Sequence, residues 1–211
     1  MLKINEIFYS IQGESSMSGM PCIFIRLTYC NLRCSYCDTE YSFHEGKDMS
    51  IDDILKKIKN YNCKLVEVTG GEPLLQKESI DLMTILLNDN YKVMLETGGS
   101  LPIKNVPKDV IKIVDFKCPS SNMHKKNDWN ILKDLQKHDE IKFVIGNYED
   151  YEWTKNKINS YNLNEKRILL SPVHDVLKSK DLSEWILKDG INARLQLQLH
   201  KYIWSPDTKG V

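Results

Sequence analysis

Short apolar runs rich in β-branched residues alternate with segments of helical periodicity along most of this chain. Such alternation is typical of βαβ units, which assemble into a parallel sheet or a barrel, so we expect an α/β fold. No low-complexity stretch, repeat or Gly/Ser linker interrupts the pattern, which predicts a single domain over residues 1–211. The predicted strands are residues 22–28, 64–70, 91–97, 110–116, 140–146, 167–172 and 193–200, and the predicted helices are residues 50–61, 77–90, 148–162 and 179–190.

Two of the predicted helices carry recognisable end signals. Ser50 is placed to cap the first helix, and Asp53 three residues later completes an acidic form of the capping box. Gly190 follows the last helix at the position where glycine commonly ends one. Because functional sites in α/β folds lie at the carboxyl ends of the strands, we expect the site of this chain there.

The composition argues against several classes of protein. A chain of 211 residues can bury one sizeable core, and its 29 basic and 29 acidic residues give no signal for nucleic-acid or membrane-surface binding. No apolar run approaches the roughly 20 residues of a membrane span, and the first residues do not resemble a signal peptide. We therefore expect a cytoplasmic protein, in which six cysteines are too few for a disulfide scaffold.

Three of the cysteines, Cys30, Cys34 and Cys37, lie within eight residues directly after the first predicted strand. Thiols this close together in a reducing compartment are more often metal ligands than anything else. The other three cysteines are isolated and fit the common role of a small buried residue. Thiolates are soft ligands that suit zinc or an iron–sulfur cluster.

The spacing of the three thiols favours the cluster over zinc. A structural zinc site is closed by four ligands, and the fourth would have to be His44, Cys63 or a remote residue. A cubane 4Fe–4S cluster can instead be held at three irons, which leaves the fourth iron open to a substrate or cofactor. Zinc stays the alternative.

The segment CNLRCSYC resembles the cluster motif of the radical S-adenosylmethionine (SAM) superfamily, and VTGGEPLLQ (68–76) and LETGG (95–99) are similar to two further elements. The resemblance implies that SAM binds the open iron and yields a 5′-deoxyadenosyl radical that abstracts hydrogen. It also implies an abbreviated (partial) radical SAM β/α barrel of mostly parallel strands, because the chain is short for six complete units. The SAM-binding residues that it implies are Tyr36, Cys37, Asp38, Gly70, Gly71, Glu72, Glu96, Lys117, Pro119, Ser120, Ser171 and Pro172.

A second resemblance narrows the substrate. The stretch EIFYSIQGESSMSGMPCIFIRLTYCNLRCSYCDT and the final LQLQLHKYIWSPDTKGV are similar to the 7-carboxy-7-deazaguanine synthase family. That family contracts 6-carboxy-5,6,7,8-tetrahydropterin to 7-carboxy-7-deazaguanine with loss of ammonia, in queuosine biosynthesis. The resemblance implies that Thr39 is the protein ligand of a Mg²⁺ ion. Without the resemblance, Thr39 would be interpreted as a helix N-cap. The substrate-binding residues that it implies are Ile11, Gln12, Gly13, Glu14, Arg26, Thr69, His200 and Val211.

Glu14 and Arg26 have the chemistry that such a substrate needs. A carboxylate can accept two parallel hydrogen bonds from the guanidine-like N–H edge of a pterin. Arg26 is the only charge on the apolar strand at 22–28, and a buried arginine needs a partner. That partner is either an anionic substrate or a carboxylate of the protein.

Two alternatives remain open. A glycyl-radical-enzyme activase would dock a large protein and would leave the IQGE and CDT segments unexplained. A non-catalytic iron–sulfur or zinc module would fill the fourth ligand position and would leave the GGEP turn without a role. The synthase interpretation implies an external electron donor such as flavodoxin or ferredoxin, a homodimer, and no nucleic-acid or membrane partner.

Overall fold

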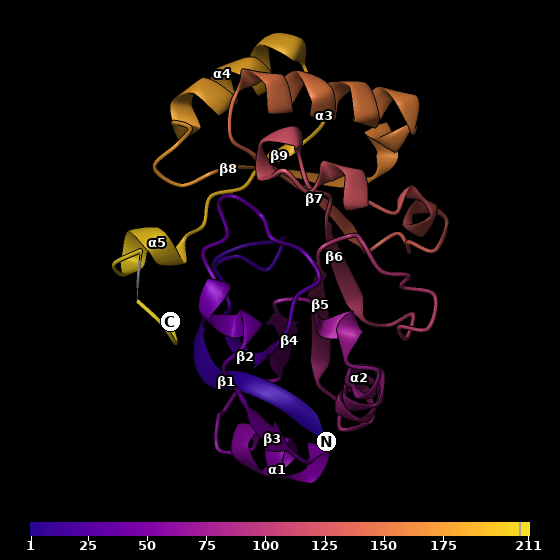
Figure 1. Ribbon diagram of the computed structural model, residues 1–211, viewed down its shortest axis with the longest axis vertical. Coiled ribbons are helices and arrows are strands. Elements are labelled where there is room, and N and C mark those ends of the chain that lie inside the picture. Colours follow the sequence, from indigo (N-terminus) through magenta and orange to yellow (C-terminus); the bar gives the residue numbers. More distant parts are fainter. Residues whose placement is uncertain (207) are drawn as a thin grey trace.

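The computed structural model describes residues 1–206 and 208–211, and its centre is one nine-stranded sheet (Figure 1). The strand order is β3-β1-β2-β4-β5-β6-β7-β8-β9. The seven strands from β2 to β9 are parallel, whereas β1 pairs antiparallel with β2 and with β3. The strands are β1 (Leu2–Ile11), β2 (Pro21–Leu27), β3 (Lys47–Met49), β4 (Leu65–Gly70), β5 (Lys92–Thr97), β6 (Ile111–Asp115), β7 (Glu140–Ile145), β8 (Arg167–Pro172) and β9 (Arg194–Leu195).

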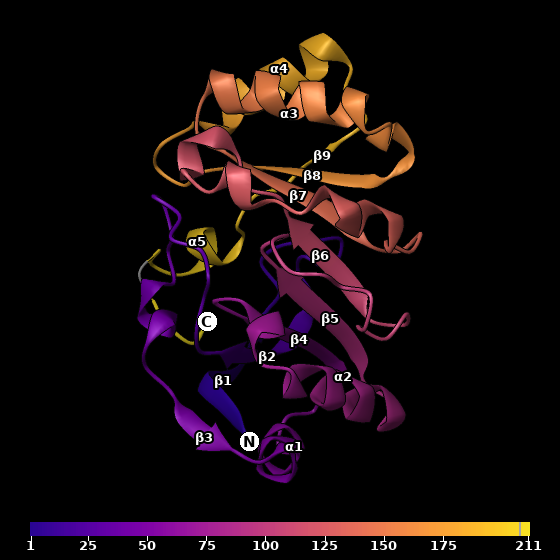
Figure 2. The same ribbon diagram turned by 45° about the vertical axis from the view of Figure 1, so that its right-hand side comes forward.

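The helices cover the sheet unevenly, as Figure 2 shows. Among the described residues, the connections from β5 to β6 and from β6 to β7 contain no α-helix, and the second of these holds three short 3-10 turns. This confirms the expected abbreviated barrel. The α-helices are α1 (Ile51–Ile58), α2 (Glu78–Asn88), α3 (Tyr148–Ser160), α4 (Ser179–Asp189) and the short α5 (His200–Ile203). No helix in the described part of the chain is long and apolar enough to cross a membrane.

Both predicted helix end signals are confirmed. The Ser50 hydroxyl accepts a hydrogen bond from the Asp53 N–H at 3.1 Å and donates one to the Asp53 carboxylate at 2.7 Å. Gly190 ends α4 with a φ of 62°, in the left-handed region where a residue without Cβ is not strained.

The side chains of the strands alternate between two buried faces. Those of one face pack against the helices in the larger core. The opposite face is the inside of the partial barrel, where a smaller cluster, here called the apolar floor, is buried. The apolar floor consists of Phe8, Cys22, Phe24, Leu65, Met94, Ile111, Ile113 and Leu169.

A layer of charged side chains lies next to the apolar floor, toward the carboxyl ends of the strands. Because alternate residues of a strand share a face, the next inward positions toward the carboxyl ends lie two residues further along each strand. Four of these positions carry charges: Arg26 on β2, Glu67 on β4, Glu96 on β5 and Asp115 on β6. With Lys142 on β7, they form what we call the charged layer.

The prediction was incomplete at the two ends of the chain. It missed β1 and β3; a register shift between Ile4 and Glu6 breaks the alternation of β1, which hides the strand in the sequence. The strand predicted at 193–200 is wrong beyond Leu195, since the chain leaves β8 there and His200 begins α5. Its alternating pattern belongs instead to an extended segment that lies against the pocket described next.

Candidate active site

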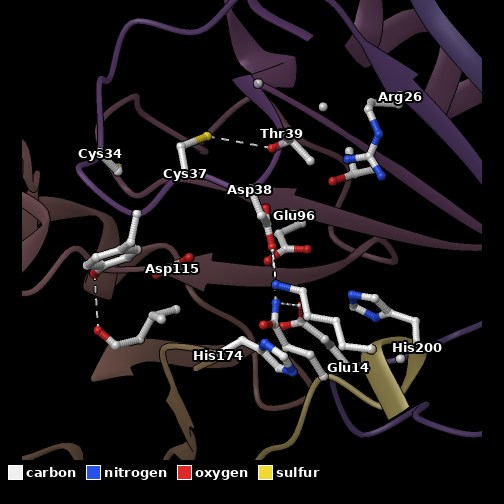
Figure 3. Close-up of a pocket in the computed structure, with 18 of the residues that line it drawn as sticks. Glu14, Arg26, Cys34, Cys37, Asp38, Thr39, Glu96, Asp115, His174 and His200 are labelled. Atoms are coloured by element: carbon white, nitrogen blue, oxygen red, sulfur yellow. Dashed lines mark hydrogen bonds and ion pairs between the residues drawn. The ribbon is translucent and has the colours of Figure 1, made fainter. Parts of the chain in front are cut away.

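A cavity of about 900 Å³ opens at the carboxyl ends of the parallel strands, where the site is expected (Figure 3). The charged layer lines it, together with the cysteine loop after β2 and the segment after β9. Seventeen of the predicted site residues line this cavity: Gln12, Gly13, Glu14, Arg26, Cys30, Cys34, Tyr36, Cys37, Asp38, Thr39, Thr69, Gly70, Gly71, Glu96, Lys117, His200 and Val211.

The three cysteines of the predicted cluster site lie on one loop that the protein holds in place. Arg33 donates from one nitrogen to the carbonyls of Cys30 (2.8 Å) and Leu32 (2.6 Å). Further along, Ser35 donates its N–H to the Ser121 carbonyl at 3.1 Å and its hydroxyl to the Ser120 carbonyl at 2.6 Å. The loop is therefore held largely by hydrogen bonds to backbone carbonyls that do not involve its thiols.

The GGEP turn packs closely on this loop. The Glu72 N–H donates to the Tyr29 carbonyl at 2.8 Å, and a Cβ on Gly71 would lie only 2.7 Å from the Cβ of Cys30. Only glycine allows this approach, which leaves backbone groups of the turn beside the cysteine loop. The backbone of the turn is thus available to a ligand of the cluster.

The donor set fits a 4Fe–4S cluster. All three thiols are free and half-buried. Within residues 1–206 and 208–211, no three His, Cys, Asp or Glu side chains converge as the ligands of a single ion do. Three free thiols on one loop are the donor set of a cluster in which each of three irons takes one thiolate.

Two thiols of the loop, those of Cys30 and Cys34, have raised pKa values and hold their protons. Burial raises the pKa of Cys30, and it raises the pKa of Cys34 to about 11, while the nearby Lys117 ammonium partly offsets both shifts. Lys117 itself is paired with the Asp115 carboxylate at 2.7 Å. Since metals bind thiolates, loading of the site releases protons.

Lys142 lies at the centre of the cavity wall opposite the cysteine loop. Its ammonium pairs with the Glu14 carboxylate and lies 2.8 Å from the Glu96 carboxylate. Burial would raise the pKa of Glu14, but the Lys142 charge together with the hydrogen bonds from Lys142 and Gln198 outweighs it and holds that pKa below its ordinary value. Gln198 donates to the second Glu14 oxygen at 3.0 Å. Glu14 is thus a buried carboxylate that keeps its negative charge.

Arg26 has a protein partner. Its Nε lies 2.8 Å from the Glu6 carboxylate, which also accepts a 3.0 Å hydrogen bond from the Tyr41 hydroxyl. The sequence left a structural ion pair and a substrate contact open for this arginine, and the ion pair is present. Among the described groups, none accepts from the two terminal nitrogens, so Arg26 keeps donors for a ligand of the cavity.

Thr39 begins a 3-10 helix (Glu40–Phe43) but does not cap it with its side chain. Its hydroxyl lies 3.7 Å from the Cys37 sulfur, at the wall of the cavity. The neighbouring Asp38 carboxylate pairs with Lys201 at 2.7 Å. Helix capping therefore does not account for Thr39, whose hydroxyl contacts the Cys37 sulfur and faces the cavity.

The segment after β9 closes the open side of the partial barrel. The Leu199 N–H donates to the Gly13 carbonyl at 2.9 Å, and a Cβ on Gly13 would lie 2.1 Å from the His200 ring. This contact explains why Gly13 can only be glycine. Burial lowers the pKa of His200 below its ordinary value, so its imidazole is neutral at pH 7.

The remaining predicted site residues lie just outside the cavity. Glu72 bonds to Thr97 and to the Gly98 N–H at 2.8 Å, so its carboxylate joins two strand-end turns. Ser120 is tied to Asp150 on α3. Beyond β8, the cavity is lined by Val173 and the three residues after it. The predicted residues outside the cavity are Ile11, Glu72, Pro119, Ser120, Ser171 and Pro172.

Three residues of the charged layer escaped the sequence analysis: Glu67, Asp115 and Lys142. Glu67 is the single charge of the apolar strand LVEVTG, and this is the same signal that selected Arg26. IKIVD and EIKFVI each carry two charges, Lys112 with Asp115 and Glu140 with Lys142, so that signal alone does not single out Asp115 and Lys142.

Comparison with known proteins gives one consistent result. The model of the radical SAM superfamily matches residues 24–121. The 7-carboxy-7-deazaguanine synthase of Koribacter versatilis (strain Ellin345) is 45% identical over 226 residues, which cover 100% of both chains. That of Chlorobaculum tepidum is 44% identical over 214 residues, which cover 100% of this chain and 97% of the relative.

Solved structures agree in fold. The crystal structure of QueE from Escherichia coli matches with a TM-score of 0.76 and 25% identity over 94% of each chain. The structure of SuiB from Streptococcus suis bound to SAM shares the fold alone, with a TM-score of 0.53 and 15% identity over 81% of this chain and 45% of SuiB. The likeness to the first protein therefore covers nearly the whole chain, and the likeness to the second only a common framework.

Proposed function

The chain belongs to the 7-carboxy-7-deazaguanine synthase family of the radical SAM superfamily, and from this premise we propose that its cavity binds 6-carboxy-5,6,7,8-tetrahydropterin and contracts the pterin ring. The product is 7-carboxy-7-deazaguanine, and one nitrogen leaves as ammonia. The observation that supports this most is that one cavity joins the cysteine loop, the GGEP turn, the IQGE loop and the segment after β9. An activase site would have no use for the last two.

The cofactors of the family are a 4Fe–4S cluster and SAM, which together supply a hydrogen-abstracting radical when bound. Cys30, Cys34 and Cys37 would hold the cluster. Backbone groups of Gly70 and Gly71 lie beside that loop and would bind the amino group of SAM. Across the cavity, Glu96 and Lys117 offer a carboxylate and an ammonium to the rest of SAM.

The wall formed by β1, β2, β7 and the segment after β9 would hold the pterin. Glu14 is charged and positioned by Lys142, so it can accept from the N–H edge of the heterocycle. The free nitrogens of Arg26 suit the substrate carboxylate, while Thr69 and the neutral His200 add uncharged polar groups. The segment after β9 covers this wall and excludes water from it.

Mg²⁺ would bind between Thr39 and the substrate carboxylate, since a lone hydroxyl is too weak a ligand without further oxygen atoms. Thr39→Ala is expected to lower turnover by roughly tenfold or more, while Thr39→Ser keeps part of the activity. The melting temperature should hardly change, because the Thr39 side chain caps no helix. Turnover against Mg²⁺ concentration, measured beside thermal unfolding, checks both points; normal Mg²⁺-dependent turnover by Thr39→Ala would contradict the metal role.

The partners follow from the same proposal. Asn31, Arg33 and Ser35 of the cysteine loop are exposed, so an external donor such as flavodoxin or ferredoxin can approach the cluster closely. A homodimer and a place in cytoplasmic queuosine biosynthesis are proposed by analogy with the family.

Anaerobic reconstitution tests the function directly. The iron-loaded protein, given SAM, Mg²⁺ and a chemical reductant, is expected to convert 6-carboxytetrahydropterin to 7-carboxy-7-deazaguanine and to release one ammonia for each product. Mass spectrometry and an ammonia assay measure both. A protein that cleaves SAM but leaves the pterin unchanged would contradict the proposal and favour the activase alternative.

A further inference from the structure

We propose that Glu67 is a positioning residue that anchors the side-chain amide of Gln12 and, through it, the loop that presents Glu14 to the pterin. Glu67 is not proposed to contact the reacting groups of any ligand, and its role goes beyond the family assignment. The inference rests on the proposed function, because it names the substrate whose binding the loop serves.

Glu67 lies at the boundary between the apolar floor and the charged layer. Its neighbours in register are Phe24 on β2 and Met94 on β5, both members of the floor. The residue is only 4% exposed, and that exposure faces the cavity, whose lining includes Glu67. It is thus a carboxyl group set in an apolar surface beneath the substrate site.

Gln12 connects this carboxyl group to the Glu14 loop. The Gln12 side-chain NH₂ donates to Glu67, and its side-chain oxygen accepts the Glu14 N–H at 3.1 Å. The Gln12 backbone is also engaged, since its N–H donates to the Met20 carbonyl and its carbonyl accepts the Gly19 N–H, both at 2.8 Å. Both ends of the Gln12 side-chain amide and both of its backbone groups are thus engaged, and these contacts hold the loop to β4.

Among the described residues, no cation forms an ion pair with Glu67. Lys142 pairs with Glu14 and Glu96 and lowers the pKa of Glu67 only in part, and Arg26 on the adjacent strand pairs with Glu6. The fully buried Cys22 thiol also lies beside it, and burial raises the pKa of that thiol and holds it protonated. A carboxylate here would be buried, unpaired and close to two other acids, which is unfavourable.

The carboxyl group therefore works in its neutral form. Burial and the nearby Glu96 charge raise the pKa of Glu67 to about 8. A neutral acid accepts the Gln12 hydrogen bond with one oxygen and adds no third negative charge next to Glu14 and Glu96. Ionisation above that pH would repel Glu14 and loosen the arrangement that positions it.

Two substitutions separate anchoring from charge. Glu67→Met removes the acceptor and is expected to raise the KM for the pterin by about tenfold or more, because the Gln12 amide is left unpaired. Glu67→Gln keeps a neutral acceptor and is expected to recover most of this loss. It should also move the alkaline decline of kcat/KM, which is expected near pH 8 in wild type, to higher pH. Iron content and substrate-free SAM cleavage report on the side of the cavity that holds the cysteine loop, and both should stay as in wild type. Glu165→Met, at an exposed acid after α3, is the matched control.

A substrate-independent measurement keeps the inference separate from the proposed function. A carboxyl group with a raised pKa lowers folding stability as the pH rises from its ordinary 4.5 toward about 8, and the loss is constant above that. In the cluster-loaded protein, the melting temperature of Glu67→Gln relative to wild type should therefore increase from pH 5 to pH 8 and then level off.

The outcomes are distinguishable. Suppose that wild type leaves the pterin unchanged but the melting temperatures differ as described. The proposed function then fails and the link from Glu67 to pterin binding is lost, while the neutral state of Glu67 stands. If Glu67→Gln is as damaging as Glu67→Met, or its pH profiles match wild type, the neutral anchor is overturned.

Discussion

Alanine at any one of Cys30, Cys34 and Cys37 is expected to abolish cluster binding and, with it, SAM cleavage and pterin turnover. The three thiols share one loop that backbone hydrogen bonds hold in place, so the loss of one leaves an iron without its ligand while the loop keeps its shape. Iron analysis and the visible absorption of the reconstituted protein measure the effect. Wild type should bind about four irons per chain.

The other cysteines provide the matched controls. Cys22 and Cys118 are fully buried, and Cys63 donates to carbonyls at the amino ends of β2 and β4, away from the cavity. Their alanine variants should keep the full iron content. Loss of the cluster in Cys63→Ala, or its retention in Cys34→Ala, would show that the ligand assignment is wrong.

Glu14→Gln is expected to give the second large effect, a loss of pterin turnover with the cluster intact. Losing one partner of a buried charged hydrogen bond costs about 2–5 kcal/mol, which corresponds to roughly 30-fold or more in kcat/KM for the pterin. Glutamine preserves the shape and the contact with Gln198 but presents no negative charge to the N–H edge of the substrate. Pterin turnover and substrate-free SAM cleavage are measured side by side.

A matched control distinguishes recognition from stability. Glu152→Gln breaks the ion pair with Lys155 on α3, outside the cavity, and should leave both activities as they are. Equal loss of pterin turnover and SAM cleavage in Glu14→Gln would mean that Glu14 supports the fold or the SAM side of the cavity rather than the substrate.

The sequence predicted the parallel part of the fold well. The strand predicted at 140–146 became β7, one residue shorter, because an apolar run with β-branched residues and flanking polar turns admits few other structures. The missing helices around β6 were also expected from the shortness of the middle region. The cysteine loop was selected as a metal-ligand candidate from its spacing, since the chemistry of close thiols is local, and its role as the cluster ligand stays a prediction.

The parts that the sequence did not predict depend on contacts between distant segments. The irregular β1 becomes a strand because β2 and β3 flank it, and nothing in its own pattern shows this. Lys142 becomes a site residue only because the loop carrying Glu14 folds over β7. Spacing along one chain does not show which buried charges will meet, whereas the register of the strands does.

The segment that closes the barrel also bears on the order in which the protein folds. Neighbouring parallel strands are consecutive along most of the sheet, so they can pair as the chain is built. The hydrogen bond from Gln198 to Glu14, in contrast, spans 184 residues, and the ion pair from Lys201 to Asp38 spans 163. Contacts of such separation carry the greater loop-closure entropy and form late. The cysteine loop can therefore be complete while the pterin wall is still open, and local unfolding of the last segment can admit substrate or release product without disturbing the sheet.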